Sequence, residues 1–336
     1  MKAAFIPSSP AALLAIASVV TILCGMIALT VGQEPISLQE VWRALTQPDP
    51  HNMDHAVVQT SRLARVVVAV LVGASLAVAG GLMQALTLNP LASPGLFGIN
   101  AGAMFAVVLI APVIGAVSFS HFMLLAFVGA GATGALVYAV GMRGPARSDQ
   151  ARLVLAGAAI SSLLFSFTQA ALVINQDGLD SILFWLAGST AGRGMNEVRL
   201  AWAPIVLGLL GSAALARHLN ILVAGEAIAR GLGQNVGRLR LLLSVCVILL
   251  AGTAVSLAGT VGFVGLVVPH IVRRLFPNDF RWLLPGYALF GALLLLLADL
   301  LGRIVLPPEE IPVGAMTALI GAPYFIYLTR RSGQHA

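Results

Sequence analysis

The chain has 336 residues, of which 59% are hydrophobic and only 10% are charged, and its formal net charge is +6. Soluble domains carry about 25% charged residues, so this composition excludes a soluble globular protein and indicates an integral membrane protein. The excess of positive charge is expected to reflect membrane topology, because no basic surface interleaved with aromatic residues accompanies it.

Ten apolar segments follow one another along the chain, and each is expected to cross the membrane as a helix. About 20 apolar residues span a hydrocarbon core of roughly 30 Å, and backbone polar groups in lipid must pair within their own segment. The position of the cut between the seventh and eighth segments stays open. The predicted spans are 11–31, 63–86, 96–117, 121–142, 153–175, 200–216, 241–261, 262–275, 283–302 and 311–329.

Basic residues are unevenly divided between the two sides of this arrangement. With the N-terminus in the cytoplasm, most of the 19 lysines and arginines lie inside, and most acids lie outside. This distribution agrees with the positive-inside rule. It places both termini and the polar segment 219–240 on the cytoplasmic side.

A weak internal repeat relates the second predicted span to the seventh. The two spans run in opposite directions, so the match predicts an inverted repeat of spans 2–5 and 7–10, as found in transporters. Chance matches in a chain with 35 glycines are the alternative. An offset of 179 residues aligns Gly73 with Gly252, Ala79 with Ala258, Gly80 with Gly259 and Pro90 with Pro269.

The chain offers little chemistry of its own. Its only lysine is Lys2, so it is not expected to hold a GxxxxGK[ST] phosphate-binding loop, and no catalytic motif lies in the spans. Asp299 is the one firmly intramembrane acid, and Arg303 at i+4 predicts a local ion pair. We expect no metal site and no cofactor: His51 and His55 are expected in a loop, and Cys24 and Cys246 as inert buried thiols.

Five long motifs are similar to those of the FecCD family of ABC-importer permeases, whose members carry ferric siderophores, haem or cobalamin. The resemblance covers about residues 11–331, and one departure is RLAR at 62–65, where the family usually has RLPR. It implies a type II importer permease, with residues 1–336 as one transmembrane domain. The motifs are RLARVVVAVLVGASLAVAGGLMQALTLNPLASPGLFGINAGA, GEAIARGLGQNVGRLR, GTVGFVGLVVPHIVRR, LLPGYALFGALLLLLADLLGR and EIPVGAMTALIGAPYFIYL.

The resemblance also implies roles for particular residues. Segment 219–240 resembles the coupling helices that seat on an ATPase subunit, and its glycines suit two short helices. The implied ATPase contacts are Glu226, Ala229, Arg230, Leu232, Gly233 and Val236. Arg62 and Arg303, with Arg65 as a weaker candidate, are expected to dock a substrate-binding protein, or else only to anchor helix ends. The implied translocation path comprises Ser161, Ser162, Phe165, Gln169, Met316, Thr317 and Ile320.

Together these features predict the permease of a binding-protein-dependent importer in the inner (cytoplasmic) membrane, carrying an iron chelate by alternating access. The implied partners are a second permease subunit, two ATP-binding subunits and a periplasmic or lipid-anchored binding protein. The chain itself is not expected to be an enzyme. Haem or cobalamin is the alternative cargo, and a secondary transporter driven by an ion gradient is the alternative mechanism.

Overall fold

The computed structural model describes residues 9–114, 118–141, 149–174, 185–307 and 309–332, and its regular elements are helices. Three short turns of other helical types interrupt them: the π-helical η1 (Val58–Arg62) and η3 (Ala106–Ile110) and the 3₁₀ turn η2 (Pro94–Phe97). The α-helices are α1 (Pro10–Thr30), α2 (Leu38–Thr46), α3 (Met53–Val57), α4 (Leu63–Thr87), α5 (Ile99–Phe105), α6 (Ala111–Val113), α7 (Phe119–Gly141), α8 (Asp149–Ile174), α10 (Met195–Ala214), α11 (Ala216–Val223), α12 (Glu226–Gly231), α13 (Val236–Ala258), α14 (Val264–Leu275), α15 (Phe280–Ile304) and α16 (Val313–Ser332).

Within the described residues, seven helices are long and apolar enough to cross a membrane: α1, α3–α4 as one run, α7, α8, α10, α13 and α15. Two of the other three predicted spans contain shorter apolar helices, Ile99–Ile110 and Val313–Ile326. The eighth matches α14, and the break before it is real, since Gly259 has a φ of +70° and Phe263 one of +65°. The third was expected as one helix over 96–117, which is wrong: the described part is divided into η2, α5, η3 and α6.

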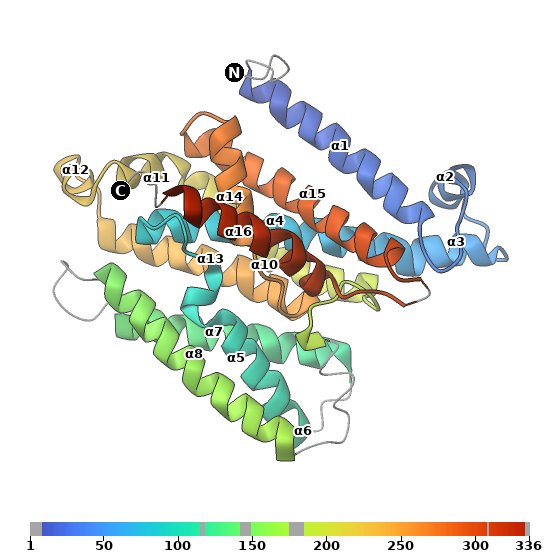
Figure 1. The fold of residues 1–336 in the computed structure, drawn as a ribbon, viewed down its shortest axis with the longest axis horizontal. Helices are drawn as coiled ribbons and strands as arrows, with labels where there is room; N and C mark the ends of the chain where they lie inside the picture. Colours follow the sequence, from blue (N-terminus) through green and yellow to red (C-terminus); the bar gives the residue numbers. More distant parts are fainter. Residues whose placement is uncertain (1–8, 115–117, 142–148, 175–184, 308, 333–336) are drawn as a thin grey trace.

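Helix α4 lies at the centre of the molecule, covered on several sides by other helices (Figure 1). Most of its residues are buried, and it packs against α13, α15 and α14. By contrast, α1 packs mainly on α15 and leaves apolar side chains such as Ile22 and Leu23 more than half exposed. A helix that is apolar all round is expected in a membrane, where lipid covers the outward face.

Close approach between the central helices depends on glycine. A Cβ atom at Gly80 of α4 would overlap the carbonyl oxygen of Gly265 in α14, and one at Gly73 would overlap that of Gly291 in α15. Small residues permit such contacts between helices in membranes. Their repeat partners differ: Gly252 has ordinary space around it, and Gly259 ends α13, whereas α4 continues beyond Gly80. The matched glycines therefore serve different purposes.

We expect Gly80→Ala to destabilise the protein severely, because the backbones of α4 and α14 would have to separate. Gly252→Ala is the matched control: it is also a buried glycine of a central helix, but its Cβ would meet Ala130 at 3.5 Å. Thermal unfolding in detergent, followed by size-exclusion chromatography, tests both variants. Equal melting temperatures for the two would contradict this account of the packing.

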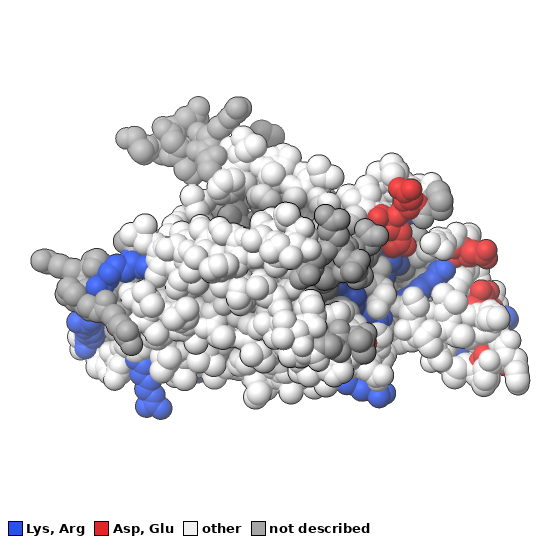
Figure 2. Space-filling model, turned by 90° about the horizontal axis from the view of Figure 1, so that it is seen from below, with Lys and Arg blue, Asp and Glu red and all other residues white. Residues whose placement is uncertain are grey.

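Charged side chains gather at the two ends of the molecule, and an uncharged belt separates them (Figure 2). Basic side chains occupy the end that carries α12, hereafter the α12 end. Acidic side chains gather, together with further basic ones, at the opposite end, where α2 and α3 lie, hereafter the α3 end (Figures 1 and 2). This polarity is what the positive-inside rule predicts for a chain whose α12 end is cytoplasmic.

Candidate functional site

The α12 end carries two short helices, α11 and α12, between the long helices α10 and α13. Gly225, with a φ of +130°, separates α11 from α12, and Gly233, with a φ of +78°, follows α12. Side chains with a Cβ rarely adopt such conformations, so glycine is required at both breaks. Asn235 then caps α13 by accepting the N–H of Arg238 at 3.0 Å. The sequence expectation of two short helices is confirmed, with α11 beginning slightly earlier, at Ala216.

The six residues expected to contact an ATPase divide into two groups. Ala229 and Val236 are buried and join the main core, which fixes α12 to the body of the protein. Arg230, Leu232 and Gly233 are exposed, and the Leu232 side chain is 68% exposed. Glu226 lies between these groups: it binds Arg230 at 2.5 Å and Arg240 at 3.0 Å.

One residue of this surface was not expected from the sequence: Ile228, which is 52% exposed. It stands four positions before Leu232, so the two apolar side chains lie close to one another on the surface of this short segment. An exposed apolar pair flanked by charges is a feature of protein interfaces, where an apolar centre is surrounded by a polar rim. The i, i+4 spacing was the available signal in the sequence.

Helix α11 is also tied to α15. Asn220 of α11 donates to Asp279 at 2.7 Å and accepts the N–H of Phe280 at 2.9 Å, so it holds the first turn of α15. Hydrogen bonds from Arg281, and then from Asn220, lower the pKa of Asp279 to about 2. Asp279 therefore stays ionised at neutral pH, and Asn220 links α11 directly to the start of a membrane-spanning helix.

At the α3 end, Arg62 and Arg303 are both buried and both bind the end of α1. The last carbonyl groups of a helix lack partners within it and attract positive charge. All four at the end of α1 have donors here. The N–H of Val31 donates to Ile27 O, and the Arg303 guanidinium donates to Ala28 O at 2.9 Å. The Arg62 guanidinium donates to Leu29 O and to Thr30 O, both at 2.9 Å. This geometry supports the alternative that the two arginines anchor a helix end, without testing their part in docking.

Arg65 and Asp299 connect four segments of the chain at the same end. Arg65 of α4 binds Asp299 of α15 at 2.9 Å and Glu310, which precedes α16, at 2.6 Å. Asp299 also accepts a hydrogen bond from the Thr190 hydroxyl. It pairs with Arg303 as well, as the i, i+4 spacing predicted. A cleft of about 510 Å³ opens beside this network, and the three guanidinium groups and the carboxylates of Glu34, Asp54 and Glu310 line it. This volume is enough to admit a few side chains of a partner protein.

The residues expected to line a translocation path do not meet within the described chain. Helix α8, which carries Ser161, Ser162, Phe165 and Gln169, packs on α5 and α7. Helix α16, which carries the others, packs on α15 and α14. Ser162, Phe165 and Gln169 are exposed and Ser161 is half-buried, whereas Met316 and Thr317 lie inside the protein and Ile320 is at its surface.

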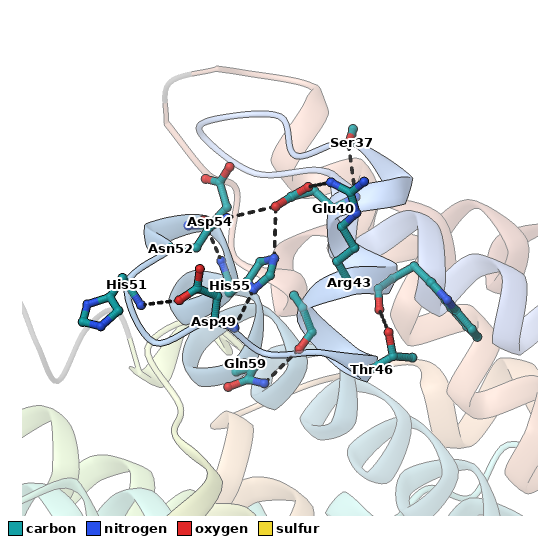
Figure 3. A network of polar contacts seen from close by, with 12 residues as sticks. Ser37, Glu40, Arg43, Thr46, Asp49, His51, Asn52, Asp54, His55 and Gln59 are labelled. Carbon is teal, nitrogen blue, oxygen red and sulfur yellow. Dashed lines mark hydrogen bonds and ion pairs between the residues drawn. The ribbon is translucent and has the colours of Figure 1, made fainter.

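The two outer histidines have separate surroundings. His51 is exposed in a turn, and its backbone N–H donates to Asp49. His55 is buried in α3, where its Nε2 contacts Glu40 at 3.0 Å and its Nδ1 accepts the N–H of Asp49 at 2.9 Å (Figure 3). The expectation of a loop is therefore right for His51 and wrong for His55. Both cysteines are buried, as expected.

Comparisons with known proteins agree on one family. The model of the FecCD transport family matches residues 20–331. The probable siderophore transport system permease protein YfiZ of Bacillus subtilis is 43% identical, over 90% of this chain and 91% of its own length. The Fe(3+)-citrate import system permease protein YfmD of the same organism is 42% identical, over 90% of both chains. A putative metal-chelate type ABC transporter in an inward-facing conformation superposes with a TM-score of 0.83 at 29% identity, covering 96% of this chain and 99% of that one.

Proposed function

The chain belongs to the FecCD transport family, and from this premise we propose that it is the permease of a binding-protein-dependent ABC importer for an iron chelate. The match over nearly the whole chain is the observation that carries this proposal. Residues 1–336 form one permease domain in the cytoplasmic membrane, with both termini and the α12 end in the cytoplasm. The charge distribution between the two ends supports that orientation.

A ferric siderophore or ferric citrate is the proposed cargo. The relatives named above are assigned to siderophore and ferric citrate transport, which supports this class. The proposed wall on α8 and α16 consists of hydroxyl, amide, aromatic and aliphatic groups, which suit a bulky chelate more than a bare ion. A bare iron ion needs several carboxylate, imidazole or thiolate ligands, and no group of three such side chains occurs among the described residues.

The proposed path is shared between two permease subunits. Ser162, Phe165 and Gln169 of α8 are exposed in the single chain, which supports a wall completed by a second copy or a related permease. Met316 and Thr317 are buried behind the surface of α16, whereas Ile320 is exposed on it, which supports Ile320 as a proposed cargo contact of that helix. Alternating access then requires the two subunits to rearrange about this interface.

Two ATP-binding subunits supply the energy in this proposal, and the permease does no covalent chemistry. The surface formed by Ile228, Arg230 and Leu232 is the proposed seat of one ATPase subunit. The Asn220–Asp279 contact supports a route from that seat to α15. At the other end, the arginine-lined cleft is the proposed site where a carboxylate of the binding protein docks, which would give register and rapid association more than affinity.

Reconstitution tests the proposal directly. Proteoliposomes would hold this permease with its ATPase subunits, and binding protein would be loaded in turn with ferric citrate, a ferric catecholate, a ferric hydroxamate, haem or cobalamin. We expect ATP hydrolysis and iron uptake to be stimulated by one ferric chelate. Stimulation by haem or cobalamin alone would show that the proposed cargo is wrong. Uptake driven by an ion gradient without ATP would overturn the proposal.

A further inference from the structure

Helix α2 has three distinct flanks, although it is only nine residues long. Successive residues lie about 100° apart around a helix axis, so Leu38, Trp42 and Leu45 fall within about 60° of one another. These three side chains, the apolar stripe of α2, are 58%, 61% and 37% exposed. Glu40 and Arg43 lie on the opposite flank. The third flank, with Val41 and Ala44, is buried against α1 and η1.

The start of α2 is held at the level where α1 ends. The backbone N–H of Ile36 donates to Thr30 O, the last carbonyl of α1, at 3.1 Å. Arg62 binds the same carbonyl and that of Glu34, so the connection between the two helices is fixed. Because α1 has 21 residues and spans about the thickness of a hydrocarbon core, α2 begins at the boundary between lipid tails and headgroups.

The polar flank of α2 is fixed by α3, which sets the rotation of the helix. Glu40 accepts the side-chain amide of Asn52 at 2.9 Å and contacts His55 Nε2 at 3.0 Å (Figure 3). Ser37 caps the helix by accepting the N–H of Glu40 at 3.2 Å. With Glu40 held on one side, the apolar stripe must point to the other side, away from the polar network.

We propose that the apolar stripe of α2 is a lipid-binding surface that lies in the membrane interface at the α3 end. It continues the apolar outward face of α1, whose Ile16, Leu23 and Ile27 are each about half exposed along the span. Figure 1 shows α2 beside the end of α1, at the edge of the molecule. A helix with one apolar and one charged flank lies in the plane of the interface, and tryptophan is enriched at that depth.

This contact would fix the depth of the α3 end. Through Glu40 and His55 it holds α3, and the backbone continues from α3 through η1 to Arg62 and Arg65. The lipid leaflet is therefore a third support for the arginine-lined cleft, beside α1 and α15. A protein partner covering the stripe is the competing occupant, and the experiment distinguishes it.

Fluorescence of Trp42 alone tests the proposal. Trp185→Phe, Trp202→Phe and Trp282→Phe leave Trp42 as the single tryptophan in the full-length protein, reconstituted in phosphatidylcholine vesicles. We expect strong quenching by lipid brominated near the headgroup, weaker quenching by lipid brominated near the bilayer centre, and little quenching by aqueous iodide. Efficient iodide quenching with no effect of either brominated lipid would overturn the proposal.

A cysteine pair gives a second readout if the tryptophan variants fold poorly. In a Cys24→Ala, Cys246→Ala background, Trp42→Cys and Arg43→Cys place thiols on opposite flanks of α2. A membrane-impermeant maleimide should label Arg43→Cys several-fold faster than Trp42→Cys in vesicles, and both equally after denaturation in dodecyl sulfate. Equal rates in vesicles, or protection of Trp42→Cys only when loaded binding protein is added, would refute a lipid contact.

Discussion

Asp299→Asn is expected to unfold the α3 end of the protein. Asp299 is 1% exposed at its side chain and faces two arginines, Arg303 at 2% and Arg65 at 14% exposure. Removing one partner of a buried ion pair costs about 3–5 kcal/mol, because the charge left behind is neither solvated nor paired. Here Arg65 would keep Glu310, but Arg303 would lose its carboxylate partner and would still face the like charge of Arg65. We expect the apparent melting temperature in detergent to fall by roughly 5–10 °C.

Glu310→Gln is the matched control for this prediction. It removes a carboxylate from the same arginine, but Glu310 is 26% exposed, and Arg65 would keep Asp299 as a partner. A partly exposed ion pair contributes about 1 kcal/mol or less, so this variant should melt close to the wild type. If the two variants lost the same stability, the central place of Asp299 in the network would be wrong.

Hydropathy predicted most of the fold, because a membrane span can be recognised from the length of its apolar run alone. The runs that became α1, α4, α7, α8, α13 and α15 were identified to within a few residues at most of their ends. The same method treated 96–117 as one helix, since it does not register the left-handed Gly98 or the change to π-helical turns after Phe105. It also missed α2 and α3, which are short and mixed in polarity.

In the candidate site too, contacts between residues close in sequence were predictable and contacts between distant residues were not. The Asp299–Arg303 pair followed from a spacing of four residues, which any helix converts into a contact. The contacts of Asp299 with Arg65 and Thr190 join residues separated by 234 and 109 positions. The hydrogen bond from Arg303 that caps α1 also joins distant residues, 275 positions apart. Such contacts depend on how α1, α4 and α15 pack together, which no local pattern specifies.

Leu232→Asp is expected to abolish recruitment of the ATPase subunits while leaving the permease folded. Leu232 is 68% exposed in the free chain, so the substitution removes little internal packing. A carboxylate buried without a partner at the centre of an interface should reduce the binding free energy by about 2 kcal/mol or more, as much as the loss of a hot-spot residue. That corresponds to a decrease in affinity of about 30-fold. Co-purification of the ATPase with a tagged permease measures it.

The choice of Leu232 over Glu226 follows from the contacts of Glu226. A double variant that removes the side chains of Glu226 and Arg230 should also abolish transport. However, Glu226 binds Arg240, whose side chain is only 8% exposed, so that double variant disturbs the start of α13 as well. Leu232→Asp leaves the contacts of Glu226 with Arg230 and Arg240 in place, and a loss of ATPase binding then reports on the surface itself.

Leu306→Asp supplies the control for the same substitution elsewhere. Leu306 is 53% exposed and follows α15 near the α3 end, on the opposite side of the membrane from the proposed ATPase seat. It should co-purify with the ATPase as the wild type does. Normal ATPase binding by Leu232→Asp would remove α12 from the coupling surface and leave α11, with its Asn220 contact to α15, as the element through which ATP-driven closure reaches the membrane helices.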